Sequence, residues 1–176
     1  MSGAFVLQVD QSLYAPIATL TVGVLAAVFA FWGIQSQRGI ARRRATLDFI
    51  MKSETDGDMI KARLRFIELS KDVNGLGPWA ALDKEKTDEA QKIKLILNEF
   101  ELIAIGIKRG IIDKQLYCNW FKSGAIKHWD HAEPFVNILR SRTGNNALYI
   151  EFQQFVMSID SKRGNGIKHK IKRLLD

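Results

Sequence analysis

One stretch of the sequence, residues 17–34, limits what this chain can fold into. It reads IATLTVGVLAAVFAFWGI, with no ionisable side chain and with Thr19 and Thr21 as its polar residues. At about 1.5 Å per residue, a helix of this length covers roughly 27 Å, close to the hydrocarbon thickness of a bilayer. We therefore predict a transmembrane helix over residues 17–35. The alternative is a buried helix of a soluble bundle, but such helices rarely stay uncharged for so long.

The charges on either side of this stretch predict its orientation. Residues 1–37 contain no Lys or Arg, and the first basic residues follow directly as Arg38, Arg42, Arg43 and Arg44. A cleaved signal peptide needs its positive charge before the apolar core, so that interpretation fails. Because positive charge beside a spanning helix stays in the cytoplasm, we expect residues 1–16 to lie outside and the chain after Arg38 to lie in the cytoplasm.

Small residues within the span allow a second hypothesis. Gly23 and Ala27 have the small-xxx-small spacing that lets two membrane helices approach closely. Since most such spacings are incidental, self-association through this face is a hypothesis. It belongs to one possible function, that of an oligomeric effector that perturbs membranes.

The rest of the chain has the periodicity of an all-α protein. Apolar residues recur at spacings of three and four, and no stretch alternates with period two. We expect a basic juxtamembrane helix over residues 36–53, a compact multi-helix domain over residues 54–161 and a basic tail over residues 162–176. The single cysteine, Cys118, excludes an internal disulfide framework and fits a reducing compartment.

Helix boundaries in the domain follow from capping signals. Thr55 and Asp58 have the spacing of a capping box, which opens a helix that extends toward Val73. Trp79 and Leu82 are expected to fix the next loop to the core. Later helices are expected from Asp113 to Ser123, from residue 129 to 139 with a bend or a start at Pro134, and over residues 146–161.

The helix expected over residues 84–109 is the most informative. One apolar stripe includes Ile96 and Phe100, and a second is formed by Leu95, Leu102 and Ile105. Two apolar faces predict a helix that is packed on two sides. It should end at Gly110 in the left-handed conformation, with Ile111 as the hydrophobic contact and Asp113 as the cap of the next helix.

Candidate catalytic and metal-binding residues are few. His128, Asp130, His131 and Glu133 share a short segment, but two His residues do not complete a metal site, so a surface cluster beside a buried Trp129 is the preferred interpretation. Glu99 and Glu101 point to different faces of their helix and cannot form an acid–base pair. Glu101 is expected to be partly buried and to form an ion pair with a buried arginine. We predict no enzyme activity, no metal and no cofactor.

The tail, residues 162–176, reads as a basic amphipathic helix. Ile167, Ile171, Leu174 and Leu175 form one stripe between basic residues, among which Lys168, Lys170, Lys172 and Arg173 are candidates for binding lipid or nucleic acid. Docking of the apolar stripe on the domain is the third possibility.

The stretch LNEFELIAIGIKRGIID at residues 97–113, followed by HWDHAEPFV and by Leu148, Tyr149 and Phe152, resembles a bacterial and phage-associated family, domain of unknown function 4760. The resemblance covers roughly residues 43–155. The resemblance implies one N-terminal helix in a bacterial inner membrane and a helical cytoplasmic domain. It implies no catalytic activity, because the family has no established one. The motif positions resemble packing and turn positions; they are Asn98, Glu99, Phe100, Glu101, Gly106, Gly110, Trp120 and Trp129.

These observations predict a single-pass membrane protein that acts by binding through its cytoplasmic domain, in a setting of bacterial and phage interaction. Its partners would be the lipid bilayer and either another protein or a second copy. A membrane-tethered nucleic-acid binder is the alternative, although membrane topology already explains the arginines from 38 to 44.

Overall fold

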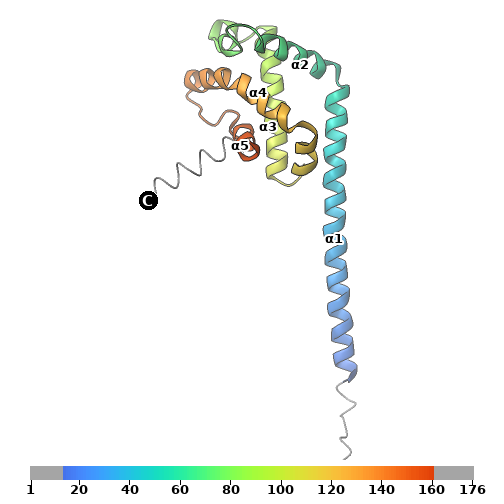
Figure 1. Cartoon of the computed structure of the whole chain (residues 1–176). Helices are drawn as coiled ribbons and strands as arrows, with labels where there is room; N and C mark the ends of the chain where they lie inside the picture. The colour runs from blue at the N-terminus through green and yellow to red at the C-terminus, as the bar shows by residue number, and fades with distance from the viewer. Residues whose placement is uncertain (1–13, 161–176) are drawn as a thin grey trace, which may run out of the picture. The chain divides into compact units, whose positions relative to one another are not determined.

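The protein is helical throughout the described part of the chain. A computed structural model describes residues 14–160 and contains no β-strand in that range, which confirms the predicted all-α fold class. In chain order the elements are α1 Tyr14–Thr55, α2 Gly57–Ser70, the 3₁₀ helices η2 Gly77–Ala80 and η3 Leu82–Lys84, α3 Asp88–Lys108, α4 Lys114–Thr143 and α5 Ile150–Ile159 (Figure 1).

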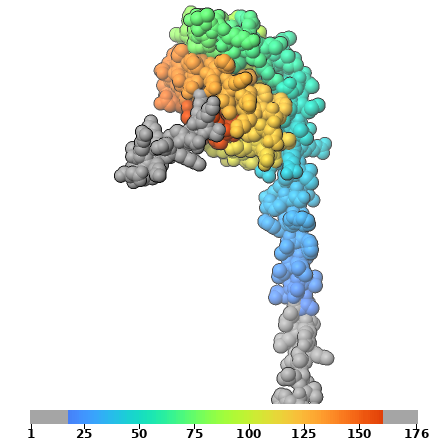
Figure 2. Space-filling model, in the orientation of Figure 1, coloured from blue at the N-terminus to red at the C-terminus, as the bar shows by residue number. Residues whose placement is uncertain are grey.

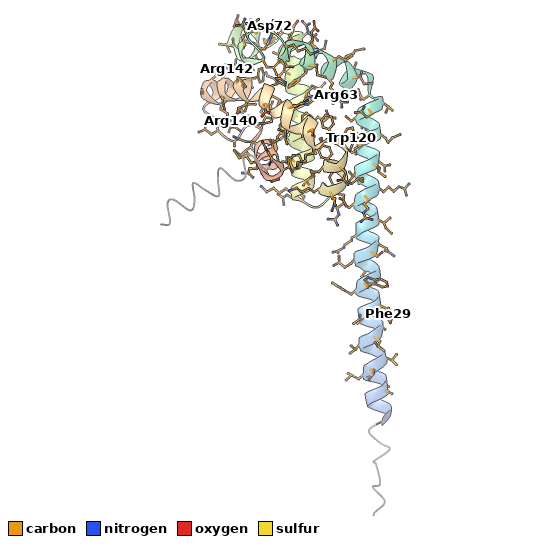
Figure 3. The ribbon with its side chains drawn as sticks, viewed as in Figure 1. Phe29, Arg63, Asp72, Trp120, Arg140 and Arg142 are labelled. Atoms are coloured by element: carbon orange, nitrogen blue, oxygen red, sulfur yellow. The ribbon has the colours of Figure 1, made fainter. Side chains whose placement is uncertain are left out.

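Helix α1 contains the predicted apolar span and continues well beyond it. Within residues 14–160, it is the one helix long and apolar enough to cross a membrane, over Ala18–Thr55. The side chains of residues 18–32 are all exposed, among them Phe29, which is labelled in Figure 3. An exposed apolar surface of this kind is consistent with the predicted transmembrane helix.

The chain divides into two compact units, and the division falls inside α1. The first ends at Ala41 and the second begins at Arg42. The last part of α1, residues 42–55, therefore belongs with the helical domain. Thr46 and Ser53, seven residues apart and hence on one face of α1, are buried there.

The core of the domain surrounds α3. Helices α2 and α5 both pack on α3, and α4 packs on α5 and on η2. In the view of Figure 1, α4 passes across α3, and it forms much of the visible surface of the domain in Figure 2. Aromatic rings fill the centre: the Phe100 and Phe152 rings stack with centroids 4.6 Å apart, and Trp129 meets Phe152 edge-on at 5.3 Å.

The predicted capping box at the start of α2 is wrong. The Thr55 hydroxyl donates to the Met51 carbonyl at 2.8 Å, so Thr55 still belongs to α1. Asp56 is the cap, and its Oδ1 accepts from the backbone N–H groups of Asp58 and Met59, each at 3.0 Å. A carboxylate oxygen that accepts two orphan amides satisfies the helix start better than a hydroxyl already engaged in the preceding helix.

The loop after α2 is fixed to the core by one of the two residues expected, Trp79, and by two further residues. Helix α2 ends at Ser70, which leaves Val73 outside it. Trp79 does pack against the core, but Leu82 is exposed. Leu76, just before η2, and Ala80, at its end, are the buried side chains.

The end of α3 is a Schellman motif centred on Gly110. The Ile111 N–H donates to the Gly106 carbonyl at 2.8 Å, and the Gly110 N–H donates to the Ile107 carbonyl at 3.1 Å. Gly110 has φ +69°, as expected for the left-handed position. The hydrophobic contact is made by Ile112, which covers Gly106, whereas the predicted Ile111 is exposed.

Helix α4 joins the two helices expected for this region through a kink at Phe121. Its φ of −134° and ψ of 17° leave the helical region, and the Phe121 ring folds back onto Gly124, where a Cβ atom would come within 2.5 Å of it. Gly124 is thus required by this close approach. Pro134 lies inside the helix, and α5 starts at Ile150, later than the sequence predicts.

The left-handed end of α3 predicts the effect of one substitution. Gly110→Ala should lower the free energy of unfolding by about 1–2 kcal/mol, because an L side chain at positive φ is strained. The measurement is urea-induced unfolding of the detergent-solubilised protein, followed by tryptophan fluorescence. Gly57→Ala is the matched control: Gly57 lies in α2 with open space around its Cα, so this change should be neutral or stabilising. Equal destabilisation by both changes would contradict the conclusion that Gly110 needs the left-handed conformation at the end of α3.

Candidate functional site

An open groove, which we call the α1–α3 groove, lies between α1 and α3 of the domain. Its volume is about 250 Å³. Most of its lining surface is apolar. The lining residues are Phe49, Lys52 and Ser53 of α1, Asp56 and Met59 at the start of α2, and Leu95, Asn98, Glu99 and Leu102 of α3.

The groove exists because one predicted apolar face of α3 is incompletely covered by the described residues. Ile96, Leu97 and Phe100 are buried, as the first apolar stripe predicts. Leu95, Leu102 and Ile105 are exposed, by 39%, 64% and 39%, so α3 is packed by α2 and α5 but its second apolar stripe is not one of the packed faces, contrary to the prediction. Helices α1 and α2 close over the Glu99 side of α3 and leave the neighbouring stripe uncovered.

A buried polar cluster forms the floor of the groove. Glu99 of α3 is buried and accepts a short hydrogen bond from the Ser53 hydroxyl of α1. Arg63 of α2, labelled in Figure 3, donates from Nη2 to Ser53 Oγ at 2.8 Å and lies 3.7 Å from Glu99 Oε1. Its Nη1 donates to Glu54 Oε1 at 2.6 Å. Three helices therefore meet at one carboxylate.

Burial and charge act in opposite directions on Glu99. Desolvation raises the pKa of the Glu99 carboxyl, while the hydrogen bond from Ser53 and the charge of Arg63 lower it. Burial is the stronger effect. Because Ser53 is already engaged by both Glu99 and Arg63, it is not set up as a nucleophile, and the cluster is better suited to fixing geometry than to proton transfer.

A second tie joins α1 to the domain near Thr46. The Asp113 N–H donates to Thr46 Oγ1 at 2.8 Å, and the Thr46 hydroxyl donates to the Arg42 carbonyl at 2.8 Å. Asp113 caps α4 as predicted, accepting from the Leu116 N–H at 3.0 Å, and its carboxylate lies 3.7 Å from Arg43 Nε. Arg43, one of the four arginines from which the membrane orientation is predicted, thus also contacts the domain.

Glu101 has a different role from the one predicted. Its Oε2 accepts from the Phe152 N–H at 2.7 Å and its Oε1 from the Glu151 N–H at 3.2 Å, so it satisfies the first turn of α5. The expected arginine partner is found instead at Glu99. The prediction that these two carboxylates face different sides is confirmed, since Glu99 faces α1 and α2 whereas Glu101 faces α5.

His128 is not part of a surface cluster. It is buried among the rings of Phe66, Phe100 and Phe121, with centroids 5.1 to 5.6 Å away. Its Nδ1 lies 2.8 Å from the Gly124 carbonyl, and its buried Nε2 has no hydrogen-bond partner. His131 is exposed. Across residues 14–160, no three His, Cys, Asp or Glu side chains are grouped so that they could hold a metal ion.

The remaining predicted site residues lie outside the groove. Gly23 and Ala27 are exposed on the apolar part of α1, and a Cβ at Gly23 would meet nothing within 4 Å. Arg38, Arg42, Arg43 and Arg44 are exposed on the same helix. Lys168, Lys170, Lys172 and Arg173 lie outside the described residues.

The polar cluster of Ser53, Arg63 and Glu99 is not predicted from the sequence. Glu99 is considered there together with Glu101, and no role is assigned to Ser53 or Arg63. The available signal was the position of Glu99 between the two apolar stripes of α3, where a carboxylate is half surrounded by apolar side chains and needs a partner.

The family whose model matches this chain is described as Domain of unknown function (DUF4760), and the match covers residues 20–158. It extends over both compact units, from the apolar part of α1 to the last turn of α5. Comparison with curated proteins and with solved structures gave no match.

The burial of His128 predicts a pH dependence of stability. Desolvation among aromatic rings lowers the pKa of the imidazole below 6.5, with Arg63 acting in the same direction and the Gly124 carbonyl against it. Stability is therefore complete above pH 6.5 and falls as the pH drops toward the lowered pKa, with a slope of up to about 1.4 kcal/mol per pH unit.

The measurement is the free energy of unfolding in urea between pH 7.5 and 5. His128→Leu should reduce the slope, whatever its constant effect on stability. His131→Leu, at the exposed histidine, is the control and should keep the slope of the native protein. An unchanged slope in His128→Leu would mean that other groups carry the pH dependence.

Proposed function

The chain belongs to the DUF4760 family, and from the geometry of its domain we propose that it is a single-pass membrane protein that acts by binding a protein partner in the α1–α3 groove. The observation that carries the proposal is the uncovered row of Leu95, Leu102 and Ile105 on α3. Exposed leucines in a rimmed groove are typical of interaction sites.

The membrane anchor is supported by α1. Its apolar stretch is uncharged and exposed, and basic residues begin on one side of it. The proposed arrangement has the N-terminus outside and the helical domain in the cytoplasm, because positive charge is retained there. The family resemblance favours a bacterial inner membrane and a role in bacterial and phage interaction.

Binding is favoured over catalysis by the state of the polar groups in the groove. Ser53, Glu99 and Arg63 are engaged with one another. A volume of about 250 Å³ lies below the roughly 300–1,000 Å³ common for small-molecule sites, so a few apolar side chains fit better than a cofactor.

The orientation can be tested by cysteine accessibility. In a Cys118→Ser background, Ser2→Cys should react with a membrane-impermeant maleimide on intact bacterial cells, because we place the N-terminus outside. Val73→Cys, fully exposed on the domain, should react only after the membrane is opened. Reaction of Val73→Cys on intact cells would reverse the orientation, and recovery of the protein without membranes would refute the anchor.

The groove can be tested by site-specific photocrosslinking in intact membranes. A photoreactive amino acid in place of Leu102 should give a discrete protein adduct, identified by mass spectrometry, because this side chain borders the groove. Leu64 on α2 is the matched control, since it is also a leucine with 64% exposure but does not line the groove. The adduct should be lost when Leu95→Lys is added. Equal adducts at both positions, or none at Leu102, would refute binding in the groove.

A further inference from the structure

We propose that the α1–α3 groove is occupied, in the absence of another partner, by the chain's own C-terminal segment, residues 167–175. This inference rests on the proposed function, because it names the occupant that a partner would have to displace. It is argued from the shape and charge of the groove and from the length and sequence of the chain that follows α5.

The α3 side of the groove has two apolar anchors, Leu95 and Leu102, with the polar Asn98 and Glu99 between them. The two leucines are seven residues apart, which corresponds to about 10.5 Å along a helix. Phe49 and Met59 line the opposite wall. A groove with these dimensions accepts the side chains of one amphipathic helix, whose anchors are spaced by three, four and seven residues.

The C-terminal segment has an apolar row of the same length. Ile167, Ile171 and Leu174 follow the spacing i, i+4 and i+7, so that as a helix they would also cover about 10.5 Å. The segment lies outside the described residues, and this pattern comes from its sequence. Two rows of equal length are the condition for one helix to lie along another with all its anchors in contact.

Charge supports the same pairing at Asp56. This exposed residue lines the groove together with one basic residue, Lys52, whereas Glu99 is buried and already engaged with Ser53 and Arg63. Hydrogen bonds from the backbone of Met59 and Asp58 lower the pKa of Asp56 further below neutral pH, so its carboxylate is charged there. The segment carries Lys168, Lys170, Lys172 and Arg173 beside its apolar row. Such charges steer and orient an apolar contact more than they strengthen it.

The connection between α5 and the segment is short and contains two glycines. Helix α5 ends at Ile159, and seven residues, 160–166, lead to Ile167. Extended, seven residues reach up to about 25 Å. A tether of this length holds the segment at an effective concentration in the millimolar range, so a modest affinity is sufficient for occupancy.

The test compares cysteine reactivity in the full-length protein, reconstituted in phosphatidylcholine nanodiscs with Cys118→Ser throughout. Leu102→Cys should react with a maleimide roughly tenfold more slowly when the native segment is present than when it carries Ile167→Ser, Ile171→Ser and Leu174→Ser, which corresponds to about nine-tenths occupancy. Leu64→Cys should react at the same rate in both. Equal rates at Leu102→Cys would overturn the proposal.

A second variant pair identifies the occupant directly. Leu102→Cys with Ile171→Cys should form a disulfide within one molecule under mild oxidation, seen as a crosslinked peptide in the monomer band. Leu64→Cys with Ile171→Cys should not. A crosslink found only in the dimer band would overturn the proposal in favour of a second copy.

The outcome is separable from that of the proposed function. If the groove is open in the nanodisc but photocrosslinks a partner in cells, the binding function stands and the segment is not the occupant. If the segment shields Leu102 and no partner is found, the proposal that residues 167–175 occupy the groove is supported and the proposed binding function is refuted.

Discussion

The contact on which the domain depends is the burial of Glu99 between Ser53 and Arg63. It joins α3 to the last turn of α1 and to α2 at one point, while the Arg65–Glu89 pair, 2.8 Å apart, is a second polar tie between α2 and α3. A carboxylate in this position loses hydration, and the pKa of Glu99 is raised as a result. Removing a single partner from such a cluster costs more than the cluster contributes, so its main effect is to specify one arrangement of the three helices.

This arrangement has a consequence for α1. Residues 42–55 are held in the domain at two places, through Ser53 near Glu99 and through Thr46 at Asp113. Between them, Phe49 faces the groove. The wall of the groove is therefore part of the same continuous helix that contains the apolar span. A ligand that fills the groove contacts this helix directly, without an intervening loop.

Sequence periodicity predicted the helices and their class, because the spacing of apolar residues is a local property. It did not predict which of the two apolar faces of α3 is covered, because that depends on where α1 and α2 end. The exchange of roles between Glu99 and Glu101 has the same origin: their partners, Ser53 and the start of α5, are 46 and 50 residues away. The cap at Asp56 was missed by one residue, since Thr55 and Asp56 both have suitable side chains and only the hydrogen bond of Thr55 to Met51 separates them.

Two leucines of the groove are separate from the core, although Phe49 and Met59 on its other wall pack against it. The aromatic centre made by Phe66, Phe100, Trp129 and Phe152 lies on the other faces of α3 and is buried without any contribution from Leu95 or Leu102. Leu102, exposed by 64%, keeps most of its apolar surface in water and so contributes little to folding, whereas Leu95, exposed by 39%, is the more covered of the two. An exposed leucine on a helix that already has a complete buried stripe is what the proposed occupant of the groove would account for.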